Sequence, residues 1–347
     1  MNGKKTRGLR SLVVNGALVA LAFGLFGLVI RKHWGQILEV FRHKLDPWVF
    51  VLGFAIYMVG VVGTFYRWFR LVRVLDCTFR FRDSVLLGFI GNVFNLVIPG
   101  AVGGDLIKAA YLVKMRIDNT RAIASMFIDR ILGLLGLFLL AGLAGAAAWT
   151  GTELPLKVRY LIVTAWIALG LGFVGLAAIF NQSLTRRYPR LLEGHGKLAL
   201  LLNELKAVSD AYRQNLRVVA GCLALSCASH AMSVLAWYTV STTLFPTVLP
   251  SLGQHLLLVP LTLFTMAAPL PFGALGLGET VSDELFKLVN HPEGALAMMG
   301  FRVLMYGGGL VGSFFYLTHL GQVRALTETA GHLADEIGEG ALPEQAA

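Results

Sequence analysis

Long apolar runs separated by short basic segments are the dominant pattern of this sequence. A helix that crosses the hydrocarbon core of a bilayer needs about 20 mostly apolar residues. Six stretches approach or exceed that length, namely residues 12–30, 48–66, 123–148, 158–180, 217–240 and 298–319. The pattern therefore predicts an all-α, polytopic membrane bundle with about six full spans.

Two further apolar segments, residues 84–102 and 254–278, are interrupted by glycine and proline. The first runs into Ile98-Pro99-Gly100-Ala101-Val102-Gly103-Gly104, and the second ends in Pro269-Leu270-Pro271-Phe272-Gly273-Ala274-Leu275-Gly276-Leu277-Gly278. Proline removes a backbone donor, and glycine tolerates positive φ, so both helices should break at membrane depth. One interpretation is a pair of re-entrant segments, one in each half, in an inverted repeat. The other is two ordinary helices with loops rich in glycine and proline.

The composition excludes a soluble protein of this size. Only 14% of the residues are charged and 56% are hydrophobic, and the formal net charge is +10. So few charges cannot cover a water-exposed surface, whereas a lipid-facing surface needs none. The basic residues lie between apolar runs, as in membrane proteins, so nucleic acid is not an expected partner.

The distribution of Lys and Arg predicts the orientation. Residues 67–82 and 181–217 are rich in arginine and should be cytoplasmic, whereas the loop 241–255 has no Lys or Arg and should be outside. These assignments agree if residues 84–121 enter the membrane and return to the same side. Both termini are then cytoplasmic, in a protein integral to the cytoplasmic (inner) membrane. This arrangement places the basic residues of the loop 31–47 outside, which is contrary to the usual cytoplasmic location of Lys and Arg.

The chain divides into a transmembrane domain, residues 1–322, and a cytoplasmic tail, residues 323–347. The tail is acidic and poor in large apolar side chains, which is typical of disorder. Residues 184–214 mix leucine with charged residues and predict an amphipathic helix on the cytoplasmic surface.

The first interrupted segment carries several polar side chains. Asn92 and Asn95 are three residues apart and share one face of a helix. Asp105 and Lys108 follow the glycines and should lie in a returning helix, whose N-terminal amides attract anions. Alternatively, Asp105 only caps this helix and Lys108 only flanks it.

Asp129 and Arg130 fall inside an apolar run. Ionised groups near the bilayer centre cost about 2.5–3.5 kcal/mol on insertion scales, so they usually face the bundle interior and form pairs. The two residues together are candidates for holding a lipid phosphate, with Arg130 donating and Asp129 orienting it. Arg130 could instead extend to the membrane interface.

Glu279 closes the second interrupted segment, directly after Gly276-Leu277-Gly278. It is either an acid favoured by the dipole of a helix N-terminus, or a carboxylate that pairs with a basic group or carries a proton. Arg302 and His230 are weaker candidates.

These motifs in this order resemble the flippase-like membrane domain of the lysylphosphatidylglycerol synthase/flippase family. The resemblance extends from about residue 10 to 322 and rests on Asn92 to Lys108, Ser125 to Gly133, Pro269 to Glu279 and the Arg67-Trp68 pair. It implies movement of an anionic-lipid derivative or lipid-linked headgroup between leaflets. The chain departs from the family pattern in having Leu277-Gly278 before Glu279, where a basic residue is expected. The predicted substrate-binding residues are Asn92, Asn95, Pro99, Gly100, Gly103, Gly104, Asp105, Lys108, Asp129, Arg130, Pro271, Gly276, Gly278 and Glu279.

Several other functions stay open at this point. The same residues could serve a secondary transporter of a small solute, a non-transporting membrane partner of a lipid-modifying enzyme or glycosyltransferase, or a membrane-embedded lipid transferase. The sequence has no Gly-x-x-x-x-Gly-Lys-Ser/Thr loop and no His-Glu-x-x-His. The prediction is therefore a transporter-like protein and not an enzyme, with no cofactor, no metal site, membrane lipids as partners and no assigned oligomeric state.

Overall fold

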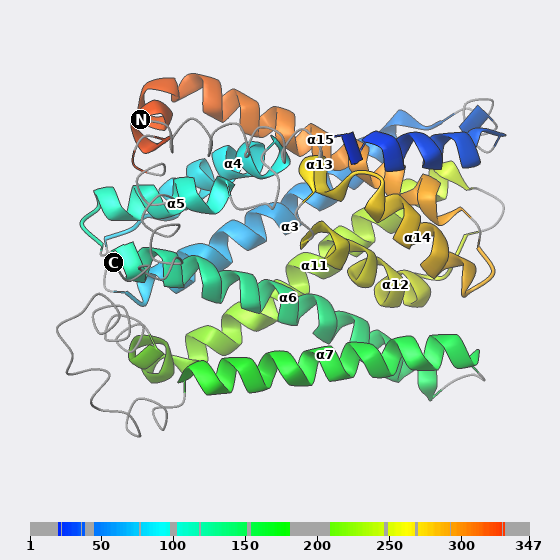
Figure 1. The fold of residues 1–347 in the computed structure, drawn as a ribbon, viewed down its shortest axis with the longest axis horizontal. Coiled ribbons are helices and arrows are strands. Elements are labelled where there is room, and N and C mark those ends of the chain that lie inside the picture. The colour runs from blue at the N-terminus through cyan, green and yellow to red at the C-terminus, as the bar shows by residue number, and fades with distance from the viewer. Residues whose placement is uncertain are drawn as a thin grey trace, which may run out of the picture.

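The protein is an all-α membrane bundle (Figure 1). The computed structural model describes residues 20–21, 23–35, 37–38, 45–75, 78–97, 103–117, 119–150, 154–180, 209–245, 249–267, 270–291, 293–327 and 329. Of the predicted tail, 323–347, residues 323–327 and 329 are described; they are helical, and Val323 and Leu326 are buried. The rest of the tail, and residues 184–208 of the predicted amphipathic helix, lie outside this range. The predicted fold class is confirmed for the part of the chain that is described.

Five of the helices in this range are long and apolar enough to cross a membrane. They are α3 (Pro47–Arg73), α6 (Asn119–Trp149), α7 (Leu156–Phe180), α11 (Leu216–Leu244) and α15 (Gly294–Thr318). Helices α3, α6, α7 and α11 each contain one predicted span in full, and α15 ends one residue before the end of its predicted span, 298–319. Of the remaining predicted span, 12–30, only residues 20–21 and 23–30 are described, and they are helical.

The long helix α3 continues seven residues past its last predicted apolar position, residue 66, to Arg73. Polar residues do not stop it, because each added residue still gains an intrahelical hydrogen bond. Its start is fixed by Asp46, whose side chain accepts a hydrogen bond from the Trp48 amide at 2.9 Å, with Pro47 in the first turn.

Helices α3 and α11 form an antiparallel pair that defines two ends of the bundle. At one end the Asp46 amide donates to Thr243 Oγ1 at 3.0 Å. At the other end the Tyr212 hydroxyl donates to the Leu71 carbonyl at 3.2 Å. Between them, Gly60 allows α3 to approach the Ser229 carbonyl of α11 closely. We call these the Asp46 end and the Leu71 end.

Each interrupted segment folds into a helical hairpin. The first hairpin comprises α4 (Phe81–Val97) and α5 (Gly103–Lys114). The second comprises α12 (Leu252–Phe264), the 3₁₀ turn η1 (Thr265–Ala267), α13 (Pro271–Ala274) and α14 (Leu277–Lys287). The second break follows the glycine and proline positions that the sequence indicates, whereas residues 98–102, between α4 and α5, lie outside the described residues.

The two hairpins occupy opposite ends of the bundle (Figure 1). The first opens at the Leu71 end, where the Arg73 guanidinium donates to the Phe79 carbonyl and Phe79 packs on Tyr111. The second opens at the Asp46 end, and its short helix α13 packs against α4 of the first. The hairpins therefore meet within the bundle.

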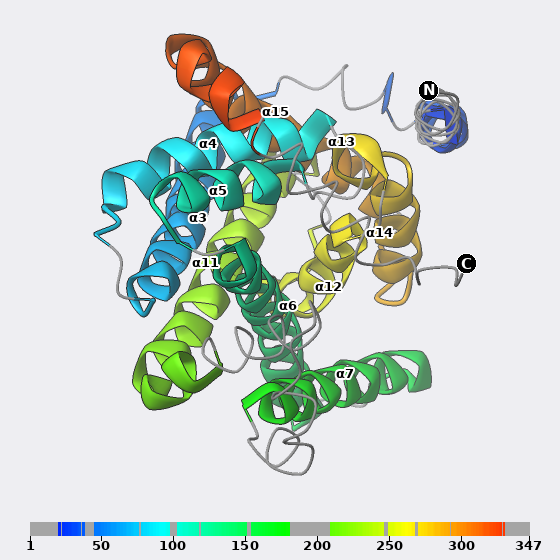
Figure 2. The ribbon, with the colours of Figure 1, turned by 60° about the vertical axis from the view of Figure 1, so that its left-hand side comes forward.

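Each hairpin has its own apolar core. The first packs on the Leu71 end of α3 through Trp68, Phe79 and Ile107. The second packs on α11 and α15 through Trp237, Phe286 and Phe301, and the Trp237 and Phe301 rings stack at 5.0 Å. Helix α7 lies at the edge of the bundle along α6 (Figure 2).

The helical residues 23–35, N-terminal to α3, pack against the second hairpin. Lys32 Nζ lies 2.7 Å from Asp283 Oδ2, and His33 Nε2 lies 3.4 Å from the same oxygen. Phe23 and Phe272 form an edge-to-face pair at 5.4 Å. These contacts join segments that are about 250 residues apart in sequence.

The first hairpin closes on a backbone contact that only glycine permits. A Cβ at Gly104 would collide with the Gly91 carbonyl and would lie 2.7 Å from Asn95 Oδ1. We expect Gly104→Ala to separate α4 from α5 and to lower the free energy of unfolding by about 1–3 kcal/mol. Chemical unfolding in detergent measures this change. Gly221→Ala is the matched control, because a Cβ there has nothing within 4 Å; an equal loss in both variants would contradict the prediction.

Candidate functional site

Arg67 joins three long helices near the first hairpin. Its Nε and Nη2 donate to the two carboxylate oxygens of Asp129 at 2.8 and 3.0 Å, and its Nη1 donates to Ser226 Oγ at 2.8 Å. Arg67 comes from α3, Asp129 from α6 and Ser226 from α11. Arg67 is only 6% exposed, so the two parallel hydrogen bonds form a largely desolvated ion pair.

Asp105 joins the first hairpin to α6. Its Oδ2 accepts a hydrogen bond from Arg130 Nε at 2.6 Å. The Arg130 side chain is 43% exposed, whereas that of Asp105 is 19% exposed. Asp129 and Arg130, which the sequence suggested would act together, thus have different partners. Consecutive helix residues point about 100° apart, so each reaches a different neighbour.

Polar side chains of α4 and α5 meet across the first hairpin. Asn95 Oδ1 accepts a hydrogen bond from the Gly104 amide at 2.9 Å, in the first turn of α5. The shared helix face predicted for Asn92 and Asn95 follows from their positions on α4, and both side chains are partly buried. Lys108 is buried, with Nζ 4.0 Å from Asp105 Oδ1. The first hairpin therefore carries six of the fourteen predicted site residues among those described: Asn92, Asn95, Gly103, Gly104, Asp105 and Lys108.

The second cluster is built on Arg302 of α15 and Glu279 of α14. Arg302 Nε and Nη2 both contact the Glu279 carboxylate, the latter at 3.0 Å. The other Arg302 N–H groups donate to the carbonyls of Phe272, Gly273 and Ala274 at 2.8, 3.0 and 3.1 Å. A guanidinium has five N–H donors, and all are used.

These carbonyls belong to a turn with unusual backbone angles. Phe272 and Ala274 have φ of 55° and 52°, a region that costs an L-residue roughly 1–2 kcal/mol. Gly276 also has a positive φ, and its amide donates to Glu279 Oε2 at 2.8 Å. Arg302 and Glu279 together stabilise the break in the second hairpin.

The predicted site residues therefore form two clusters of different character. Arg302 uses all five of its N–H donors, and both Glu279 oxygens accept hydrogen bonds within the protein, so this cluster is closed. In the first cluster Arg130 is half exposed and Lys108 has a distant carboxylate, so it retains capacity for a ligand. Glu279 pairs with Arg302 and also lies in the first turn of α14, as a helix N-terminal acid does; a proton-carrying role stays a prediction.

The remaining predicted residues lie mainly in the two breaks. Gly103 and Gly104 are buried in the first turn of α5, Pro271 is the buried first residue of α13, and Gly278 is buried next to Arg302. Pro99 and Gly100 lie outside the described residues.

Three residues of these clusters were not among the predicted site residues: Arg67, Ser226 and Arg302. Arg67 stands directly after an apolar run, and Arg302 lies inside one, which is itself an indication of function in a membrane helix. Ser226 has no such signal, since serine is common in membrane helices and its partner is 159 residues away.

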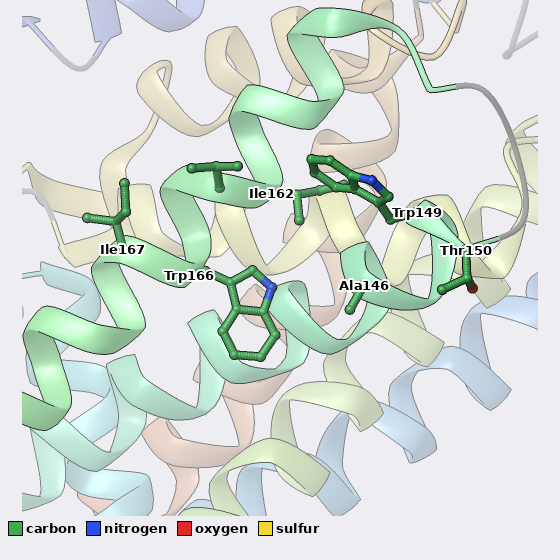
Figure 3. Close-up of a pocket in the computed structure, with 7 residues that line it drawn as sticks. Ala146, Trp149, Thr150, Ile162, Trp166 and Ile167 are labelled. Carbon is green, nitrogen blue, oxygen red and sulfur yellow. The ribbon is translucent and has the colours of Figure 1, made fainter.

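Two pockets lie away from the first cluster. An apolar groove of about 520 Å³ lies between the end of α6 and the start of α7, where Trp149 and Trp166 line it (Figure 3). A second pocket of about 370 Å³ lies between residues 23–26, the α13 turn and α15, with Arg302 in its lining. Neither pocket contains a residue of the first hairpin.

Comparison with known proteins identifies the family of this chain. The family described as the lysylphosphatidylglycerol synthase TM region matches residues 12–312. The glycosyltransferase AglD of Haloferax volcanii is 26% identical over 303 residues, covering 78% of this chain and 47% of that protein. The chain thus spans about half the length of this curated relative. Because the family match covers most of the chain, the protein belongs to the lysylphosphatidylglycerol synthase TM-region family.

Proposed function

We propose that this protein is a lipid flippase that moves an anionic-lipid derivative or a lipid-linked headgroup between the two leaflets. The single observation that carries the proposal is the half-exposed Asp105–Arg130 ion pair between the first hairpin and α6. Charged groups at membrane depth are costly and usually mark a substrate pathway. A guanidinium that already pairs with a carboxylate can exchange it for a phosphate of similar geometry.

The proposal includes a membrane topology. The first hairpin enters from the cytoplasmic side and the second from the outside, because Arg70 and Arg73 lie in the last turn of α3, at the Leu71 end. The headgroup passes along the polar face of the first hairpin while its acyl chains remain in lipid. The closed Arg302–Glu279 cluster maintains the break of the second hairpin. Access alternates as one half of the bundle moves against the other.

A lipid-scrambling assay tests this function. The purified protein is reconstituted in phosphatidylglycerol liposomes, and the movement of a fluorescent phosphatidylglycerol is followed by chemical quenching of the outer leaflet. We expect Arg130→Ala to slow the movement by about tenfold to a hundredfold, since a hydrogen bond to a charged group contributes about 1.5–3 kcal/mol.

The control is Arg70→Ala, which removes an exposed arginine of α3. We expect its rate to equal that of the wild type. Wild-type rates no faster than those of protein-free liposomes, or equal rates for the wild type and Arg130→Ala, would contradict the proposal. Uptake of a soluble solute that depends on pH, without lipid movement, would instead support a secondary transporter.

The similarity to a glycosyltransferase favours a second candidate function, in which the protein handles a lipid-linked sugar or serves as the membrane partner of a separate glycosyltransferase. The matched part covers 47% of that relative. A non-transporting partner should form a stable complex with its enzyme and should show no lipid movement alone. Co-purification combined with the scrambling assay separates this function from the first.

A further inference from the structure

Lys108 is a largely buried residue whose ammonium has incomplete partners. The residue is 9% exposed, and its Nζ lies 4.0 Å from Asp105 Oδ1, which is too far for a hydrogen bond. The same Nζ lies 5.1 Å from the centre of the Trp68 ring, a cation–π contact. No hydrogen bond from this ammonium to any other residue is found in the described part of the chain.

The neighbouring charges do not compensate Lys108. Asp129 accepts from Nε and Nη2 of Arg67, and Asp105 is closer to Arg130, whose Nε donates to Oδ2 at 2.6 Å. Among the described residues, the cluster thus has three cations, Arg67, Lys108 and Arg130, and two carboxylates, Asp105 and Asp129. A buried charge without a close partner is unfavourable, so an additional anion would stabilise this site.

Two further hydrogen-bond donors lie on the same hairpin. The Lys108 side chain passes over Gly91, where an added Cβ would lie 3.4 Å from its Cε, so Lys108 lies against α4. Asn92 follows Gly91 directly, and Asn95 lies about one turn further along α4. The Asn95 oxygen accepts from Gly104, which leaves the Asn95 amide group as a donor. Among the described residues, the Asn92 side chain has no hydrogen-bond partner.

We propose that Lys108, with the side-chain amides of Asn92 and Asn95, forms a subsite for a phosphate group. A phosphate offers several acceptor oxygens and a negative charge, and lysine binds phosphate as a point charge. This inference rests on the proposed function and narrows its substrate to lipids that carry a phosphate. A neutral lipid such as diacylglycerol would leave the Lys108 charge unpaired.

Ligand-dependent thermal stability of the purified full-length protein tests the subsite. The protein in a neutral detergent is titrated with phosphatidylglycerol, with diacylglycerol of the same acyl chains, and with inorganic phosphate. Lys108→Met removes the charge and Lys108→Arg keeps it. Lys114→Met is the matched control, because Lys114 is exposed on the same helix.

We expect phosphatidylglycerol to stabilise the wild type and diacylglycerol to have no effect. Lys108→Met should weaken phosphatidylglycerol binding by about tenfold to a hundredfold, the effect of one hydrogen bond to a charged group. Lys108→Arg should retain most of the affinity and Lys114→Met all of it. Tighter binding of phosphatidylglycerol than of inorganic phosphate identifies a lipid headgroup; the reverse identifies free phosphate, and each result supports a phosphate subsite.

The stability of the lipid-free protein distinguishes this role from a structural one. If Lys108 only supports Asp105, Lys108→Met should melt at a lower temperature than the wild type and bind phosphatidylglycerol normally, which would overturn the inference. If the Lys108 charge is instead unpaired until an anion binds, lipid-free Lys108→Met should melt at or above the melting temperature of the wild type. Should Lys108→Met fail to fold, Asn92→Leu serves instead, and unchanged phosphatidylglycerol affinity in that variant would also overturn the inference.

Failure of this inference and failure of the flippase proposal give different results. Wild-type lipid movement together with normal phosphatidylglycerol binding by Lys108→Met would contradict the phosphate subsite and support the flippase proposal. The opposite result is phosphate-dependent binding that is lost in Lys108→Met, with no lipid movement by the wild type. It would support the phosphate subsite and contradict the flippase proposal.

Discussion

Replacement of Arg302 by alanine should lower the free energy of unfolding by about 3–5 kcal/mol, the usual loss when one partner of a buried ion pair is removed. Glu279 is fully buried and would lose its counter-charge. The carbonyls of the α13 turn would also lose their hydrogen-bond donors. The unfavourable backbone angles of Phe272 and Ala274 would then no longer be offset by these hydrogen bonds. Unfolding by a denaturing detergent in mixed micelles measures the loss.

Two companion variants show whether the geometry of Arg302 matters. Arg302→Lys keeps the charge but supplies three donors instead of five, so it should recover only part of the stability. Arg324→Ala removes an exposed arginine that follows α15 and should change the stability by less than about 0.5 kcal/mol. A stable Arg302→Ala variant would mean that the turn does not depend on this side chain.

Asp129→Ala should have a comparable effect at the opposite end of the bundle. It leaves the buried Arg67 with Ser226 as its remaining partner, and we expect a loss of about 3–5 kcal/mol. Ser226→Ala, in contrast, leaves the ion pair intact and should cost only about 0.5–1.5 kcal/mol. The same unfolding measurement compares the two variants.

A double variant separates the value of the ion pair from the cost of an unpaired charge. Arg67→Met combined with Asp129→Leu replaces both charges with apolar side chains. Such replacements of buried ion pairs are often neutral or stabilising, so most of the lost stability should return. If the double variant were as unstable as Asp129→Ala alone, the loss would come from packing and not from the unpaired charge.

The helices and their breaks could be predicted because they depend on local physics. A run of about 20 apolar residues needs no partner to form a helix in lipid, since all of its backbone hydrogen bonds are internal. Likewise, Pro271 and Gly276 interrupt a helix through their own covalent structure. The elements α3, α6, α7, α11 and α15 and the second break therefore agree with the sequence pattern.

The partners of the charged residues could not be predicted in the same way. Asp129 and Arg130 are adjacent in the sequence, which suggested one shared role, yet Asp129 pairs with Arg67 and Arg130 with Asp105. Arg302 was a weak candidate on its own, and its importance follows only from a turn about 30 residues earlier in the chain. Pairing depends on which helix faces are adjacent, and apolar spacing does not encode that.

The sequence by itself determined an all-α membrane bundle, the positions of two helix breaks and the set of polar side chains available within the apolar core. Only the tertiary structure decided that these side chains divide into a closed cluster at Arg302 and an open one around Lys108. The physical reason is that helix formation and helix breaking are local, whereas the cost of a buried charge depends on partners brought together from distant parts of the chain.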